Sequence, residues 1–159
     1  MSVVSIIPDP STLPLLAGAR FADAFRCEID EQGLDAISAS RRVFARPPAW
    51  IRRLLRLRNL LVAPLGLKGT PEAAGAQSQA RIGFFPIVSQ SAERVVLGFD
   101  DKHLDFRVVV DSAPTDGGSR ITATTLVRQH NRIGRVYLTL ILPFHRIIVP
   151  AMLAQAGKP

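Results

Sequence analysis

The sequence has little of the chemistry on which many small enzymes and metal-binding domains depend. Its single cysteine, Cys27, cannot form an internal disulfide, which excludes a disulfide-stabilised secreted scaffold and favours a cytoplasmic location. The three histidines lie far apart along the chain, so no metal site is expected. The chain also lacks a glycine-rich phosphate loop, a dinucleotide-binding fingerprint and a Gly-x-Ser-x-Gly elbow. We therefore expect no cofactor.

Acidic residues are scarce, and two long stretches have none. The chain has 13 acidic and 20 basic residues, a net charge of +7, and residues 36–71 and 117–159 contain no Asp or Glu. Basic stretches of this kind attract nucleic acid, anionic lipid or an acidic partner. Nucleic acid is disfavoured because Trp50 and Tyr137 fall on apolar helix faces, where neither side chain offers an exposed platform for base stacking.

The composition is that of a folded domain. Hydrophobic residues make up 47% of the 159 residues and charged residues 21%, which predicts one domain with a real core. We place that domain at residues 21–157, after an irregular segment at 1–20. Residues 63–80 are rich in Gly, Ala and Pro and have no period, so they are predicted to form a long connecting loop.

Alternating apolar and polar residues predict an antiparallel sheet. Phe21–Ile29 has the two-residue period of a strand with one face turned inward, although Asp23 interrupts that face. Four further runs follow one another through short turn segments, which favours an antiparallel meander. These runs are residues 84–91, 94–99, 103–111 and 120–129.

Three helices complete the prediction. Residues 34–44 form a short one, and Pro47 and Pro48 open a second at residues 50–62. Residues 131–156 have a 3.6-residue period and begin at Asn131, a good N-cap. The order of elements predicts an α+β fold in which a curved antiparallel sheet is wrapped around a long C-terminal helix.

The most apolar stretch, residues 133–154, is long enough to span a bilayer. Arg135, His145 and Arg146 interrupt it, and two prolines punctuate it. We therefore interpret it as a core helix. The first residues of the chain carry no basic residue ahead of a short apolar stretch, so they do not resemble a signal peptide.

Three polar side chains lie on otherwise apolar helix faces. At 100° per residue, Arg58 falls in the middle of the apolar arc of helix 50–62. A buried guanidinium needs a partner, so Arg58 either pairs with a residue such as Asp23, extends to solvent, or anchors an anion inside a cavity. Tyr137 and His145 occupy the apolar face of the last helix. A lone histidine there is more often a hydrogen-bonded core residue than a reactive one.

One strand carries a dense set of polar side chains. Asp101, His103, Asp105 and Arg107 share one face of it because side chains alternate along a strand. Since the other face is apolar, we interpret the polar set as the solvated back of the sheet. The alternative is an acid–base site that Arg128 and His130 join from another strand.

Several segments resemble the bacterial Domain of Unknown Function 2867 family. They are VVLGFDDKHLDFRVVV at residues 95–110, TTLVRQHNRIGRVYLTLILPFHRIIVPAML at 124–153, FADAFRCEID at 21–30 and PPAWIRRLLRLRN at 47–59. The resemblance implies a helix-grip domain related to the START and polyketide-cyclase-like superfamily, whose members typically enclose apolar ligands. It implies no activity and no catalytic residues.

Our first hypothesis is a module that binds a hydrophobic or amphipathic small molecule between the sheet and the helices. Arg58, Tyr137 and His145 would orient the polar end of that molecule. The predicted wall residues are Trp50, Leu54, Phe99, Phe106, Tyr137, Leu140, Phe144 and His145.

Two other hypotheses remain open. A cofactor-independent cyclase, hydrolase or isomerase would use His145 with Tyr137, or His103 with Asp105, as acid and base. A non-catalytic interaction domain would bring its basic surface to membranes or acidic partners. A homodimer through sheet edges or apolar helices is compatible with the sequence, but no residue requires it.

Overall fold

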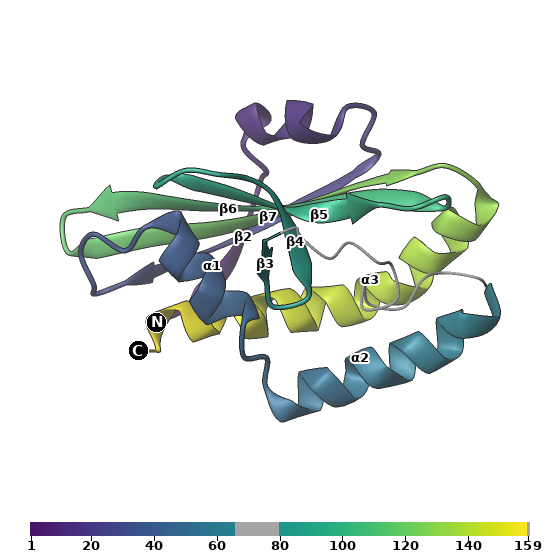
Figure 1. The fold of residues 1–159 in the computed structure, drawn as a ribbon. Helices are drawn as coiled ribbons and strands as arrows, with labels where there is room; N and C mark the ends of the chain where they lie inside the picture. The colour runs from purple at the N-terminus through teal and green to yellow at the C-terminus, as the bar shows by residue number, and fades with distance from the viewer. Residues whose placement is uncertain (66–79, 159) are drawn as a thin grey trace.

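A seven-stranded antiparallel sheet forms the framework in the computed structural model, which describes residues 1–65 and 80–158. The strands are β1 (Val3–Ile6), β2 (Phe21–Ile29), β3 (Arg81–Ile82), β4 (Phe85–Gln90), β5 (Arg94–Asp100), β6 (Leu104–Thr115) and β7 (Gly118–Gln129). Their spatial order is β1-β2-β7-β6-β5-β4-β3. The predicted α+β class and the antiparallel meander are confirmed (Figure 1).

In the described part of the chain, three α-helices and three short 3₁₀ helices accompany the sheet. They are η1 (Pro10–Leu16), α1 (Ala36–Phe44), α2 (Ala49–Val62), η2 (Ala63–Leu65), α3 (Arg132–Leu153) and η4 (Ala154–Gly157). Segment 1–20, predicted to be irregular, therefore contains β1 and η1. Most of the predicted loop at 63–80 lies outside the described residues.

The inner face of the sheet carries the main core. Alternate residues of the central strands, such as Leu97, Val110 and Ile121, are fully buried there. Helix α1 packs on one end of this face, and α2 and α3 lie below the rest of it in Figure 1. The helices thus cover one side of a curved sheet.

Part of the outer face of the sheet is covered by η1, which Figure 1 shows on the side opposite α2 and α3. Leu16 packs on Val96, Val109 and Leu126 in a second, smaller core. Asp105 lies on this same face, but only 2% of it is exposed. Our interpretation of a solvated back was therefore wrong for Asp105, because the N-terminal segment covers part of that face. It was also wrong for His103, which is 7% exposed because the start of α3 packs against it.

Helix α3 begins as predicted. The side-chain oxygen of Asn131 accepts a 3.0 Å hydrogen bond from the Gly134 N–H, which satisfies one of the free donors of the first turn. A Cβ on Gly134 would lie 2.2 Å from the carbonyl oxygen of His103, so only glycine allows the helix to approach the β5–β6 turn this closely. This contact fixes where α3 starts to cross the sheet.

The rest of α3 is not a core helix in the sense that we predicted. Leu138, Met152 and Leu153 are buried against the sheet, whereas Leu140 and Ile147 on the other side are each 62% exposed. Arg132–Gly157 is long and apolar enough to cross a membrane by length and composition alone, and 17% of its most apolar window is buried. The helix packs along one side and leaves an apolar side open.

Candidate functional site

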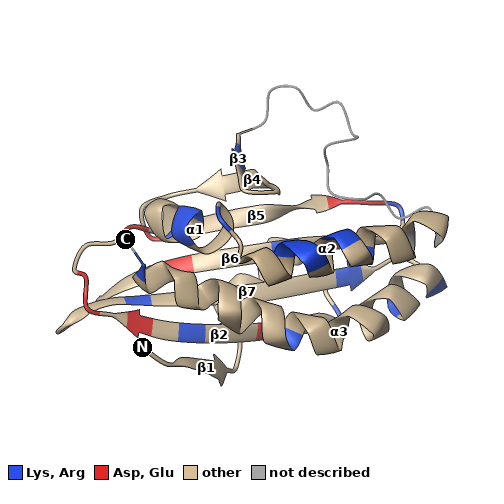
Figure 2. Ribbon diagram, turned by 90° about the horizontal axis from the view of Figure 1, so that it is seen from below, with Lys and Arg blue, Asp and Glu red and all other residues tan. Residues whose placement is uncertain are grey.

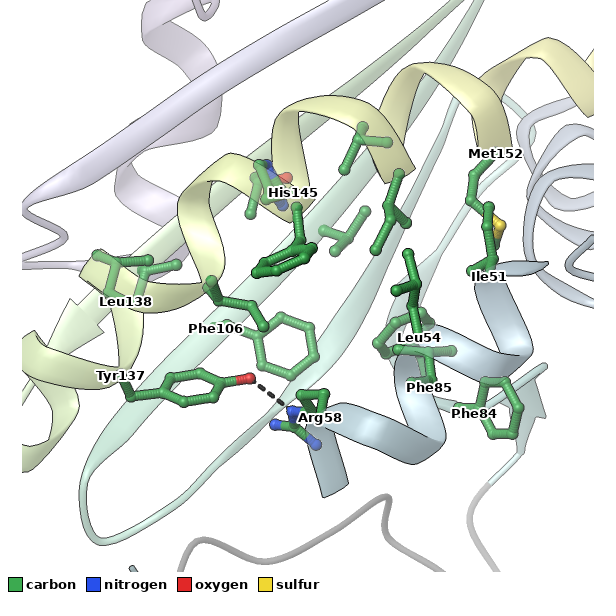
Figure 3. Close-up of a pocket in the computed structure, with 18 of the residues that line it drawn as sticks. Ile51, Leu54, Arg58, Phe84, Phe85, Phe106, Tyr137, Leu138, His145 and Met152 are labelled. Carbon is green, nitrogen blue, oxygen red and sulfur yellow. Dashed lines mark hydrogen bonds between the residues drawn. The ribbon is translucent and has the colours of Figure 1, made fainter. Parts of the chain in front are cut away.

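A cavity of about 430 Å³ lies between the inner face of the sheet, α2 and α3 (Figure 3). Its floor comes from inward-facing strand residues such as Phe106 and Val127, and its sides from the facing sides of the two helices. Phe85 and Phe106 meet edge to face at 5.6 Å between ring centres and give the floor a rigid aromatic part. The volume falls within the usual range of small-molecule pockets.

Most residues predicted to bind a ligand line this cavity. They are Leu54, Arg58, Phe99, Phe106, Tyr137, Leu140, Phe144 and His145. Trp50 does not: its side chain belongs to the first turn of α2, is 42% exposed and lies outside the lining. The sequence assigned Trp50 to the apolar face of α2. That face is wide, and its period alone does not show which part of it turns toward the sheet.

Arg58 supplies a cation at one end of the cavity. Its Nε donates a 2.8 Å hydrogen bond to the Tyr137 hydroxyl, and its Nη1 donates a 2.8 Å bond to the side-chain oxygen of Asn59. Its guanidinium carbon lies 5.1 Å from the centre of the Tyr137 ring. Within the described residues Arg58 makes no salt bridge, and the partner suggested by the sequence, Asp23, contacts another side chain.

Asp23 contacts His145 on α3. Its Nε2 lies 2.9 Å and 3.0 Å from the two carboxylate oxygens of Asp23, and both side chains are mostly buried. Asp23 is on β2 directly opposite Thr125 of β7, which also lines the cavity. The ring of Phe21 meets the imidazole edge to face at 6.0 Å. An oriented histidine therefore lies in the cavity wall with a carboxylate behind it.

Tyr137 and His145 do not form one acid–base pair. They are eight residues apart on α3, which corresponds to about 12 Å along the axis. Figure 3 shows Tyr137 pointing to Arg58, with His145 further along the helix. Each of the two side chains has its own partner, so each can contact a different part of a ligand.

The pair of His103 and Asp105 lies apart from the cavity. His103 is 7% exposed, and its Nδ1 is 2.9 Å from the Asn131 amide nitrogen, while its Nε2 is buried with no hydrogen-bond partner. Asp105 instead contacts Arg128 at 2.6 Å and His130 at 2.9 Å. These contacts place the predicted acid–base set around Asp105 without His103, on the outer face of the sheet.

The ionic contacts of Asp105 determine its titration. Burial acts to raise the pKa of this carboxyl. Hydrogen bonds from His130 and Arg128 and the charges of these side chains lower the pKa by more than burial raises it, so the net shift is downward. Arg128 also donates a 3.0 Å bond to the Ala17 carbonyl and thereby ties the segment after η1 to the sheet. We interpret this cluster as structural, because it joins the N-terminal segment to the sheet and none of Asp105, Arg128 and His130 lines the cavity described above.

Sequence reasoning missed several wall residues and one partnership. Ile51, Leu55, Leu57 and Leu61 of α2 line the cavity in addition to the predicted residues. Asp23 was noted as a break in an apolar face, and that inward position was the available signal for a polar contact inside. Across residues 1–65 and 80–158, no three metal-ligating side chains gather in one place.

Comparisons with known proteins identify a family but no activity. No protein with a curated description matches the chain. The crystal structure of protein Ms6760 from Mycobacterium smegmatis is similar to this one, with 14% sequence identity and a TM-score of 0.36. The match covers 98% of this chain and 95% of that one. The relationship to the START superfamily stays a prediction. The family model described as "Protein of unknown function (DUF2867)" matches residues 15–152, which is most of the chain, so this protein belongs to the DUF2867 family.

Proposed function

We propose that the protein binds an amphipathic small molecule in the cavity between the sheet, α2 and α3. The observation that carries this proposal is an apolar cavity with a cation at one end. Among the described residues that line it, Arg58 is the only lysine or arginine and Asp101 the only aspartate or glutamate. An oxygen of the Asp101 side chain accepts a 2.6 Å hydrogen bond from the Lys102 N–H. A ligand with an apolar body and an acidic end that binds beside Arg58 matches this distribution of charge.

The cavity gives such a ligand a direction. Arg58 and Tyr137 lie at one end of the space drawn in Figure 3, and Ile51 and Met152 lie at the other. An acidic group would bind at the first end, where the five N–H donors of the guanidinium outnumber the two hydrogen bonds that it makes with side chains of the described residues. An alkyl or aromatic body would extend toward the second end, where burial of apolar surface supplies the affinity.

The first test is to look for a bound molecule and for acid-dependent binding. Purified protein would be extracted for mass spectrometry, and thermal unfolding would be followed with medium-chain fatty acids and with alcohols of the same chain length. We expect the acids to raise the unfolding temperature more than the alcohols, because a ligand that binds only the folded state stabilises it. Absence of both a co-purified molecule and any shift would contradict the proposal.

A second candidate function is acid–base catalysis on the bound molecule. The contact of His145 with Asp23 favours it, because a carboxylate that fixes one ring nitrogen leaves the other oriented for proton transfer. His145→Gln would test it. If the protein catalyses a reaction on a cavity ligand, this variant retains binding and loses turnover; if the histidine is structural, the variant loses stability and no turnover exists to be lost.

A further inference from the structure

Helices α2 and α3 leave several large apolar side chains exposed to solvent. On α2 these include Leu57, Leu60 and Leu61, and on α3 they include Leu140, Phe144 and Ile147. Leu60 is 73% exposed. Clusters of large exposed apolar side chains on soluble proteins mark interaction sites, which points to an occupant for this surface. We call it the helix face.

The charge around the helix face is of one sign. Neither α2 nor α3 contains an acidic residue, and Figure 2 shows blue segments on both helices and no red ones. Arg53 and Arg56 border the exposed leucines of α2, and Arg132, Arg135 and Arg146 form a stripe along one side of α3. Exposed apolar side chains bordered by arginines are typical of helices that lie in a membrane interface.

We infer that the helix face docks on the surface of an anionic lipid bilayer. The leucines, Phe144 and Ile147 would enter the boundary between headgroups and acyl chains, and the arginines would contact the lipid phosphates. Helix α3 lies along the bilayer and does not cross it, because its opposite side is packed on the sheet through Leu138 and Leu153.

A second copy of the chain is a poorer occupant. A two-fold dimer places the same surface against itself, so the arginines of both copies would approach one another. No acid on either helix would neutralise them. An anionic bilayer presents phosphates to the same arginines and an apolar layer to the same leucines.

Docking in this way gives the cavity access to lipid. Leu57 and Leu61 of α2, and Leu140 and Phe144 of α3, both line the cavity and are exposed, so they form its mouth. The mouth therefore opens onto the helix face. This consequence rests on the proposed function, whereas vesicle binding itself does not.

The test is co-sedimentation of the protein with vesicles of equal parts phosphatidylcholine and phosphatidylglycerol, and with vesicles of phosphatidylcholine alone. We expect binding to the anionic vesicles, weaker binding to the neutral ones, and a decline as salt is raised. Two double variants avoid the cavity lining. Leu60→Ser with Ile147→Ser removes exposed apolar surface, and Arg53→Glu with Arg56→Glu reverses charge; each should weaken binding at least about tenfold.

Matched controls lie on the opposite side of the sheet or away from the helices. Leu13→Ser changes an exposed leucine of η1, and Arg20→Glu reverses an exposed arginine before β2; both should bind like the wild type. Circular dichroism would verify that all variants fold. No binding of the wild type to anionic vesicles, or equal loss in the controls, overturns the inference. So does a dimer in solution that the Leu60→Ser and Ile147→Ser variant dissolves.

Discussion

Replacing Arg58 by methionine removes the cation from the cavity and keeps a side chain of similar length and apolar character. In the free protein the two side-chain hydrogen bonds that Arg58 makes with described residues go to neutral groups of Tyr137 and Asn59. Its charge therefore has no salt-bridge partner among the described residues. We expect Arg58→Met to leave the free energy of unfolding unchanged or slightly higher, since a partly buried unpaired charge disappears.

The effect on a ligand should be the opposite. A hydrogen bond to a charged group contributes about 1.5–3 kcal/mol, which corresponds to about a 10- to 100-fold change in Kd. Arg58→Met should weaken the binding of an acidic ligand by that factor. It should change the binding of an alcohol of equal chain length by much less, because the apolar wall is intact.

The assay is calorimetric titration of a medium-chain fatty acid and of the matching alcohol into the wild type and the variant. Arg56→Met is the matched control. Arg56 lies two residues before Arg58 on the same helix, but it is exposed and does not line the cavity. A fatty acid that binds equally well to wild type and Arg58→Met would refute the assignment of Arg58. A cavity that binds neither ligand would refute the proposed function itself.

Three further predictions concern stability and reactivity. Asp105→Asn should lower the free energy of unfolding at neutral pH by about 1–3 kcal/mol in urea titrations, less than for a fully buried pair because both basic partners are partly exposed. The pKa of the Asp105 carboxyl is lowered on folding, so its contribution is present above the ordinary aspartate pKa of about 4 and is lost as the pH falls through the folded value. Gly134→Ala should lower the free energy of unfolding by about 1–3 kcal/mol in thermal unfolding, since its Cβ would collide with the His103 carbonyl. Gly117→Ala, whose Cβ would meet nothing within 4 Å, is the control; equal losses in the two would contradict this reasoning. Burial raises the pKa of the Cys27 thiol to about 11, so a disulfide reagent should react with it only after denaturant is added, and rapid labelling of the native protein would be the contrary result.

The sequence predicted the regular elements well where a period was clear. Strand β5 and helix α2 begin and end within one residue of their predicted bounds, and the N-cap of α3 is at Asn131. Strands β6 and β7 are longer than expected, because only Asp116 and Gly117 form the turn of the hairpin between them. In the sequence, the whole of residues 114–119 looks like a turn. Such a difference arises because cross-strand pairing overrides local preference.

The N-terminal elements and the polar contacts of the site were harder to predict. Strand β1 has four residues and gains its stability from pairing with β2, which no local pattern reveals. The contact of Asp23 with His145 joins residues 122 apart in the sequence. Helical faces predicted most of the cavity wall, because one face of a helix is defined by its period alone, whereas contacts between side chains depend on how the elements pack.

The sparse anchoring of α2 affects how the cavity opens. Among its side chains that the structure describes, Ile51 is buried and the others are partly or fully exposed. A segment with so few buried contacts unfolds locally at a lower free energy than the central strands. Amide hydrogens of α2 should therefore exchange with deuterium sooner than those of β5, β6 and β7. A molecule that contacts both α2 and α3 should slow that exchange, which would make the motion of one helix the step that admits and releases it.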